Sequence, residues 1–146
     1  MGDAIAALVD RQAVVDVCVR YAAALDRRDW DLLRQCFAPD VVAEFEGMGT
    51  LDGYEAVEAA CRGALEPLSA SQHLLGNHEV RVDGDVAHAS TYFQAQHVRP
   101  GTEGGANYIV AGTYTDRLAR DGDGWRIVHR RLDVVWTDGN SAVLGG

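Results

Sequence analysis

Apolar side chains near the start of the chain recur three, four and seven residues apart, the spacing of one face of an α-helix. They predict a helix from Asp3 to about Leu25, with these residues facing the core: Ile5, Leu8, Val15, Val19 and Ala22. Asp29 is a suitable N-cap for a second, short helix that ends before Pro39. A third helix is predicted over Tyr54–Leu65.

After Pro67 the apolar positions alternate, as they do in β-strands. Four long strands are predicted in succession: His73–Val82, Val86–Val98, Asn107–Ala119 and Trp125–Thr137. Turn sequences at 84–85 and 121–124 favour antiparallel hairpins. One earlier strand, Val41–Glu46, precedes a tight connection that is marked by Gly47, Gly49 and Gly53.

Helices followed by a long meander indicate an α+β fold, in which a curved antiparallel sheet wraps around N-terminal helices. The concave face of that sheet, closed by the first helix, is the natural place for a ligand pocket. We expect a single domain over residues 1–139 and a C-terminal tail over residues 140–146.

Charge and composition narrow the function. The chain of 146 residues has a net charge of −9, which argues against binding to nucleic acid. No apolar run is long enough for a membrane span and no signal peptide is evident, so we expect a cytoplasmic protein. The cysteines, Cys18, Cys36 and Cys61, lack the spacing of a zinc site and are predicted to be buried thiols.

Two residues of the first predicted helix are candidates for chemistry. Asp26 follows Val19 by seven residues and Ala22 by four, so it lies on the apolar stripe. A carboxylate there must be paired, protonated or beside a cavity, unless the helix has already ended and Asp26 is a solvated cap. Tyr21 lies at the edge of the stripe, where it is either a half-buried core residue or a hydroxyl facing the same cavity.

Histidine is the other source of acid–base chemistry. His73 begins the meander, in front of two leucines, and by itself is as compatible with a structural role as with that of a base. The five histidines show no helical spacing of the kind that metal sites use, so we expect no metal and no cofactor.

The pattern of the strands suggests which residues line the pocket. In the last strand Arg130 shares a face with apolar residues, so it needs an anionic or carbonyl partner, supplied by a substrate or by an internal acid. A face of aromatic and uncharged polar groups can line a polar pocket or meet solvent. The expected substrate-binding residues are Phe45, Tyr92, Gln94, Gln96, Tyr108, Val110, Leu132 and Trp136.

Several segments together resemble the SnoaL-like family of the nuclear transport factor 2-like superfamily, whose fold is an α+β cone. The resemblance runs from Tyr21 and the segment 25–30, through residues 37–41 and 49–53, to His73, and ends with the segments 111–116 and 123–127. It covers nearly the whole chain.

Within that superfamily the pattern is similar to the lyases scytalone dehydratase, bile-acid 7-alpha-dehydratase and lindane dehydrochlorinase. The resemblance implies that Asp26 and His73 form their Asp–His dyad, and that Tyr21 and Arg130 are further catalytic residues in the pocket. The sequence departs from them in two ways. Gln94 or Gln96 replaces a second pocket acid, and a second pocket histidine aligns with Gln96, which places His97 on the opposite face.

The resulting hypothesis is a cofactor-independent lyase that eliminates water, or another leaving group, from a small hydrophobic cyclic or polyketide- or steroid-like substrate. His73 would be the general base, and Tyr21 or Arg130 would stabilise an oxyanion. The alternatives are an isomerase or polyketide-type cyclase with the same pocket, and a noncatalytic ligand-binding or subunit module. We expect a homodimer or homotrimer formed through the outer face of the sheet.

Overall fold

A computed structural model describes residues 2–145 and contains three α-helices, six strands and one 3-10 helix in that range. The helices are α1 (Gly2–Arg27), α2 (Trp30–Arg34), α3 (Tyr54–Leu65) and the 3-10 helix η1 (Ser141–Leu144). The strands are β1 (Phe37–Phe45), β2 (Gly49–Asp52), β3 (Ala70–Asp83), β4 (Val86–Val98), β5 (Asn107–Asp121) and β6 (Gly124–Gly139).

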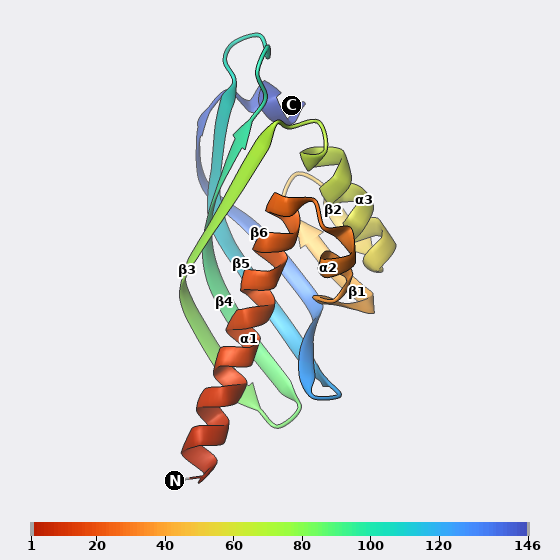
Figure 1. The fold of residues 1–146 in the computed structure, drawn as a ribbon, viewed down its shortest axis with the longest axis vertical. Helices are drawn as coiled ribbons and strands as arrows, with labels where there is room; N and C mark the ends of the chain where they lie inside the picture. The colour runs from red at the N-terminus through yellow and green to blue at the C-terminus, as the bar shows by residue number, and fades with distance from the viewer. Residues whose placement is uncertain (1, 146) are drawn as a thin grey trace.

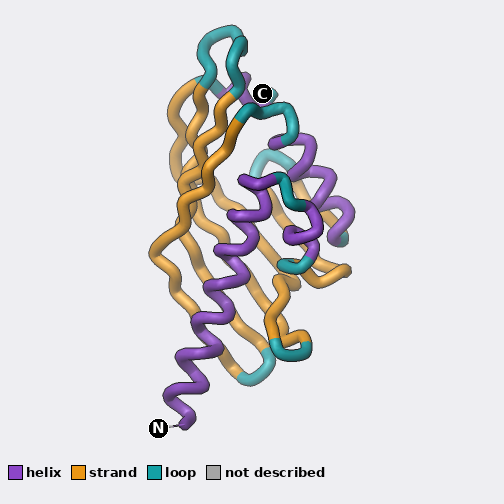
Figure 2. Tube along the Cα trace, viewed as in Figure 1, coloured by secondary structure: helices purple, strands orange, loops and turns teal. Residues whose placement is uncertain are grey.

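The strands form one curved sheet in the order β2-β1-β6-β5-β4-β3, and α1 lies in its concave side (Figures 1 and 2). The expected α+β architecture is therefore confirmed. The sheet is mixed rather than wholly antiparallel, because β1 pairs in parallel with β6. The glycine-containing connection after β1 also differs from expectation, since its residues 49–52 form β2 and pair with β1.

Helix α1 buries only part of the stripe that its sequence predicts. Val15 and Ala22 are buried as expected, together with Val14, Val17, Cys18, Tyr21, Ala24 and Leu25. Ile5, Leu8 and Val19 are exposed instead. Only the first turns of α1 extend past the end of the sheet (Figure 1), and Leu8 shares an open groove with Val80 and Val82 of β3, where it stays exposed.

Bulges break the regular alternation of the sheet. The pairing of β5 with β6 shifts register twice, where Val128 and Val135 are left without a partner. Gly112 lies opposite the second shift, and a Cβ at that position would overlap the carbonyl oxygen of Asp133. Each bulge turns the following side chains of β6 to the other face of the sheet.

The predicted C-terminal tail packs on the domain. Asn140 caps η1 by accepting a hydrogen bond from the backbone N–H of Ala142, and its amide donates to the carbonyls of Glu103 and Gly105. Val143 is buried in the core. Residues 140–145 therefore pack against the rest of the domain, while Gly146 lies outside the described residues.

The three cysteines are buried free thiols, as predicted. Burial raises the pKa of Cys36 and of Cys61 to about 12, so these thiols stay protonated at neutral pH. None of the helices in residues 2–145 is both long and apolar enough to cross a membrane.

Candidate active site

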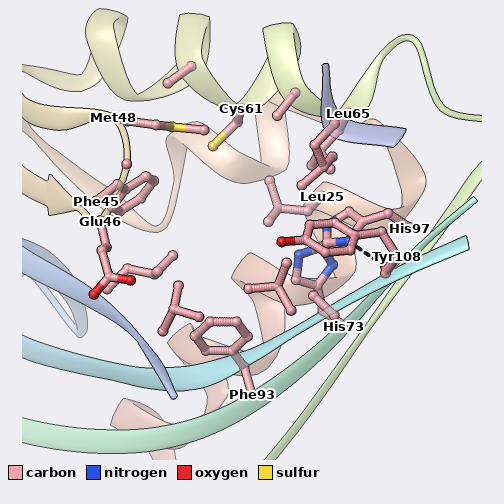
Figure 3. A pocket seen from close by; sticks show the side chains of 18 of the residues that line it. Leu25, Phe45, Glu46, Met48, Cys61, Leu65, His73, Phe93, His97 and Tyr108 are labelled. Atoms are coloured by element: carbon pink, nitrogen blue, oxygen red, sulfur yellow. Dashed lines mark hydrogen bonds between the residues drawn. The ribbon is translucent and has the colours of Figure 1, made fainter. Parts of the chain in front are cut away.

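A mostly apolar cavity of about 500 Å³ lies between the sheet and the helices α1 and α3. Its walls also include the turn after β1 and η1 (Figure 3). Four of the residues expected to bind substrate line it, Phe45, Tyr108, Val110 and Leu132, and so does the catalytic candidate Tyr21. His73 lines it as well. The cavity thus collects residues from both ends of the chain around one space.

The end of α1 holds a carboxylate against the start of β3. Oδ1 of Asp26 lies 2.7 Å from Nδ1 of His73, and Oδ2 accepts the backbone N–H of the same histidine at 2.8 Å. Burial acts to raise the pKa of Asp26, but hydrogen bonds from the ring and backbone of His73 and from Ser71 outweigh it and lower that pKa. Asp26 is therefore an ionised acceptor, and Nδ1 of His73 carries the proton.

This pairing orients the imidazole for proton transfer. With Nδ1 donating to Asp26, the neutral ring presents an unprotonated Nε2, and its side chain is only 6% exposed. The carboxylate fixes the tautomer and stabilises the imidazolium that forms when Nε2 takes up a proton. The arrangement is that of a general base at the wall of an apolar cavity.

A second histidine, His97, lies at the same end of the cavity, with its ring centroid 6.0 Å from that of His73 (Figure 3). Its Nδ1 donates to the backbone carbonyl of Tyr108 at 3.1 Å, which leaves Nε2 as a second acceptor. Burial lowers the pKa of His97, the Tyr108 carbonyl acts in the opposite sense, and His73 lowers it further. His97 is therefore neutral at pH 7.

Tyr108 completes this polar end of the cavity. Its ring centroid is 6.4 Å from that of His97, and its side chain reaches into the cavity beside the histidines (Figure 3). The phenol is a proton donor that the neutral imidazoles lack, so one end of the cavity offers two acceptors and one donor. Within residues 2–145, no group of three or more His, Cys, Asp or Glu side chains is arranged to hold a metal ion.

Arg130 is not among the residues that line the cavity. Its Nε and Nη2 each donate to a carboxylate oxygen of Asp116 at 2.7 Å, and the pair is fully buried. The guanidinium lies between two aromatic rings, 4.2 Å from the centroid of Tyr21 and 4.1 Å from that of Tyr114. The expectation that Arg130 faces a substrate is therefore corrected: an internal acid is its partner.

Tyr21 lines the cavity but is tied to the same buried cluster. Burial holds its pKa well above the usual range, and a hydrogen bond with Tyr114 acts in the same direction. The Tyr21 hydroxyl therefore stays protonated at neutral pH.

Four further expected substrate-binding residues lie outside the cavity. Tyr92 and Gln94 are exposed on the outer face of β4, and the amide of Gln96 donates to the carbonyl of His97 and to Asn107. Their strand instead turns its small and apolar residues inward, because α1 packs there. Trp136 is 44% exposed, since the bulge at Val135 turns it away.

The inward face of β4 brings His97 into the cavity wall, which the sequence reasoning missed. His97 does lie on the opposite face from Gln96, as expected, but that face is the inner one. The run Ala87, Ala89, Phe93 and Ala95 was the signal that could have found it, because a mostly apolar face belongs in the core. Glu46, Cys61 and the residues of η1 were also missed.

Comparison with known proteins identifies the family. Residues 6–131 match the SnoaL-like domain family. The chain belongs to this family.

Two relatives of this SnoaL-like protein match it at 32% identity. One is an uncharacterized protein of Mycobacterium tuberculosis, aligned over 86% of each chain. The other is the terrestric acid biosynthesis cluster protein E of Penicillium crustosum, aligned over 95% of this chain and 92% of the relative.

Solved structures share the whole fold. A protein from Kribbella flavida superposes with a TM-score of 0.88 at 26% identity and covers 96% of this chain and 99% of its own. A hexachlorocyclohexane dehydrochlorinase has a TM-score of 0.81 at 20% identity, covering 92% and 90%. A protein of Novosphingobium aromaticivorans assigned as a scytalone dehydratase has a TM-score of 0.83 at 21% identity, and the match covers 96% of this chain and 92% of that protein. At these identities the two enzymes share the fold.

Proposed function

We propose that this SnoaL-like protein is a cofactor-independent lyase of the dehydratase type, with the His73–Asp26 dyad as its general base. The observation that carries the proposal is the 2.7 Å contact between Nδ1 of His73 and Oδ1 of Asp26 at the wall of a largely apolar cavity. A dyad of this kind has little purpose in a protein that only binds a ligand. The fold shared with a dehydrochlorinase supports the same reaction class.

In the proposed mechanism, Nε2 of His73 removes a proton from a carbon next to a carbonyl group of the substrate. Asp26 stabilises the resulting imidazolium. The Tyr108 hydroxyl donates to the oxygen that gains charge, or to the departing hydroxyl, and Nε2 of His97 accepts a hydrogen bond from a substrate hydroxyl. The new double bond forms as the leaving group departs with its bonding electrons.

The cavity walls indicate the substrate. Most of the lining side chains are aliphatic or aromatic. His73, His97 and Tyr108 lie together at one end, and Glu46 lies at the other (Figure 3). A volume of about 500 Å³ suits a small cyclic molecule of two or three rings. We therefore propose a hydrophobic cyclic or polyketide-like substrate that carries a ketone and a hydroxyl at one end.

The proposal is tested by incubating the protein in D₂O with cyclic β-hydroxy ketones of one to three rings. Proton abstraction places deuterium at the carbon beside the carbonyl, and elimination removes the mass of one water. Deuterium uptake without loss of mass would favour the second candidate, an isomerase or cyclase that uses the same base. Neither change with any member of the series would argue against carbon-acid chemistry.

Glu46 sets an expectation for substrate charge. It lies at the end of the cavity away from the histidines (Figure 3), and among the described lining residues no Lys or Arg is present. An anionic ligand is therefore disfavoured. We expect Glu46→Gln to improve the affinity for a carboxylate analogue relative to its neutral amide by about fivefold at low salt, measured by calorimetry.

The matched control is Glu44→Gln. The Glu44 carboxylate pairs with Nε2 of His129 at 3.0 Å and does not line the cavity, so its removal should leave the ratio of the two affinities unchanged. Equal effects of the two variants would show that the affinity for the carboxylate depends on the net charge of the protein and not on Glu46 in the cavity.

The outer face of the sheet supports the expected oligomer. Leu74, Gln94, Ala111 and Trp136 are aligned across β3, β4, β5 and β6, and Leu74 and Trp136 are 61% and 44% exposed. We propose that a second copy covers this row, because isolated domains rarely leave such aromatic and aliphatic groups in water. Sedimentation of a 15.8 kDa monomer at micromolar concentration would contradict this.

A further inference from the structure

The dyad is held by a third hydrogen bond, which comes from outside the cavity. The Ser71 hydroxyl donates to Oδ1 of Asp26 at 3.1 Å, the same oxygen that accepts the ring of His73. Ser71 precedes His73 by two residues on β3, so both side chains point to the same face of the strand and meet the end of α1 together.

A hydroxyl has only one proton, so its direction depends on its other partners. Nη1 of Arg28 donates to Oγ of Ser71 at 2.8 Å and to the carbonyl of Leu25 at 2.6 Å. Because the guanidinium occupies the acceptor side of the hydroxyl, the proton of Ser71 is directed to Asp26. The hydrogen bonds therefore run from Arg28 through Ser71 to Asp26, which His73 meets from the other side.

The backbone of Arg28 is the unexpected feature of this chain of contacts. The N–H of Arg28 bonds to the carbonyl of Leu25 at 3.2 Å, and that of Asp29 to the carbonyl of Ala24 at 2.9 Å. This pair of bonds is the Schellman motif that ends many helices, and its central position is usually glycine. Arg28 has a φ of 55° there, in the left-handed region that is crowded for a side chain with a Cβ.

An arginine in a glycine position indicates that its side chain has a task, because the fold alone would favour glycine. We propose that Arg28 and Ser71 are positioning residues of the dyad: they hold Asp26 in the rotamer that orients His73 and keep its negative charge on the oxygen facing the imidazole. The proposal rests on the proposed function of His73 as base. Neither residue lines the cavity, so neither touches the substrate.

Arg28→Gly separates this role from a structural one. Glycine relieves the crowded backbone while removing the guanidinium, so the melting temperature should stay within about 3 °C of the wild type or rise. We expect kcat to fall by about 10–100-fold with little change in KM, as is usual when a hydrogen bond that orients a catalytic side chain is removed. Arg28→Ala keeps the crowding, so it should melt lower than Arg28→Gly yet lose the same activity.

Ser71 gives the second arm of the experiment. Ser71→Ala should lower kcat to a similar extent, Ser71→Thr should restore it, and Arg28→Gly combined with Ser71→Ala should lose no more than either alone, since both act through one hydrogen bond. Arg27→Ala is the control, because Arg27 is exposed and lies next to Arg28 without joining these contacts.

A measurement that needs no substrate keeps this test apart from that of the proposed reaction. The Nδ1–H proton of His73 should give a downfield proton resonance in ¹⁵N-labelled protein, and that signal should broaden or move in Arg28→Gly and Ser71→Ala. A changed resonance in a protein that transforms no substrate would support the positioning role and contradict the lyase. An unchanged resonance and unchanged kcat in Arg28→Gly, or a loss of kcat that simply follows the melting temperature, would overturn the positioning role.

Discussion

Replacing His73 by alanine is expected to lower kcat/KM for the elimination by about 10²–10⁴-fold, the usual contribution of a general base. The wild-type rate should be higher at neutral than at acidic pH, because a general base must be unprotonated. The hydrogen bonds to Asp26 lower the pKa of that carboxyl, so Asp26 remains ionised over this range. Initial rates from about pH 5 to pH 9, with the alanine variant as reference, measure both effects.

Asp26→Asn should be nearly as damaging, because the amide keeps the shape of the side chain but removes the charge that stabilises the imidazolium. His97→Gln is the control, because it replaces the other histidine of the cavity and leaves the dyad in place. The proposed role of His97 is to accept a hydrogen bond from the substrate, so we expect mainly a higher KM. A loss of less than about tenfold in His73→Ala would rule out a general base at this position.

Replacing Arg130 by methionine is expected to lower the free energy of unfolding by about 3–5 kcal/mol. The variant removes a guanidinium that is fully buried and leaves the Asp116 carboxylate without its two hydrogen bonds. Urea denaturation followed by circular dichroism measures the difference.

Two controls define the cause. Arg131→Met removes a side chain that is 61% exposed and pairs only with Asp133, so it should change stability by less than about 0.5 kcal/mol. Adding Asp116→Val to Arg130→Met should recover much of the loss, because an uncharged pair leaves no carboxylate buried alone. If Arg130→Met unfolds at the same urea concentration as the wild type, the buried pair does not stabilise the protein.

The dyad could be predicted from sequence because it depends on only two local features. Asp26 continues the stripe of a helix past its last apolar residue, and His73 opens a long strand that must pass that helix end. Helix and strand periodicity fix the positions of both residues, and the resemblance to lyases implied that they pair with each other. The supporting residues Ser71 and Arg28 were not found. The left-handed backbone conformation of Arg28 cannot be predicted from the pattern of hydrophobic residues.

Which face of each strand lines the cavity was harder to predict from the sequence, for two physical reasons. In β4 the polar face reads as a pocket lining, yet α1 needs the small face, Ala87, Ala89 and Ala95, for close packing. In β6 a regular alternation carries Trp136 into the pocket, whereas the unpaired residue Val135 turns it outward. A bulge of this kind depends on the neighbouring strand, and so a single strand's sequence does not reveal it.

The cavity draws its wall from parts of the chain that are far apart in sequence: α1, the turn after β1, α3, all four strands of the meander and η1. Any molecule that fills it contacts all of them at once and has no equivalent site in the unfolded chain. By mass action, a ligand at 100 times its dissociation constant adds about 2.7 kcal/mol to the folded state. A library of uncharged ring compounds can therefore be ranked by how far each compound raises the melting temperature of the protein, before any reaction is known.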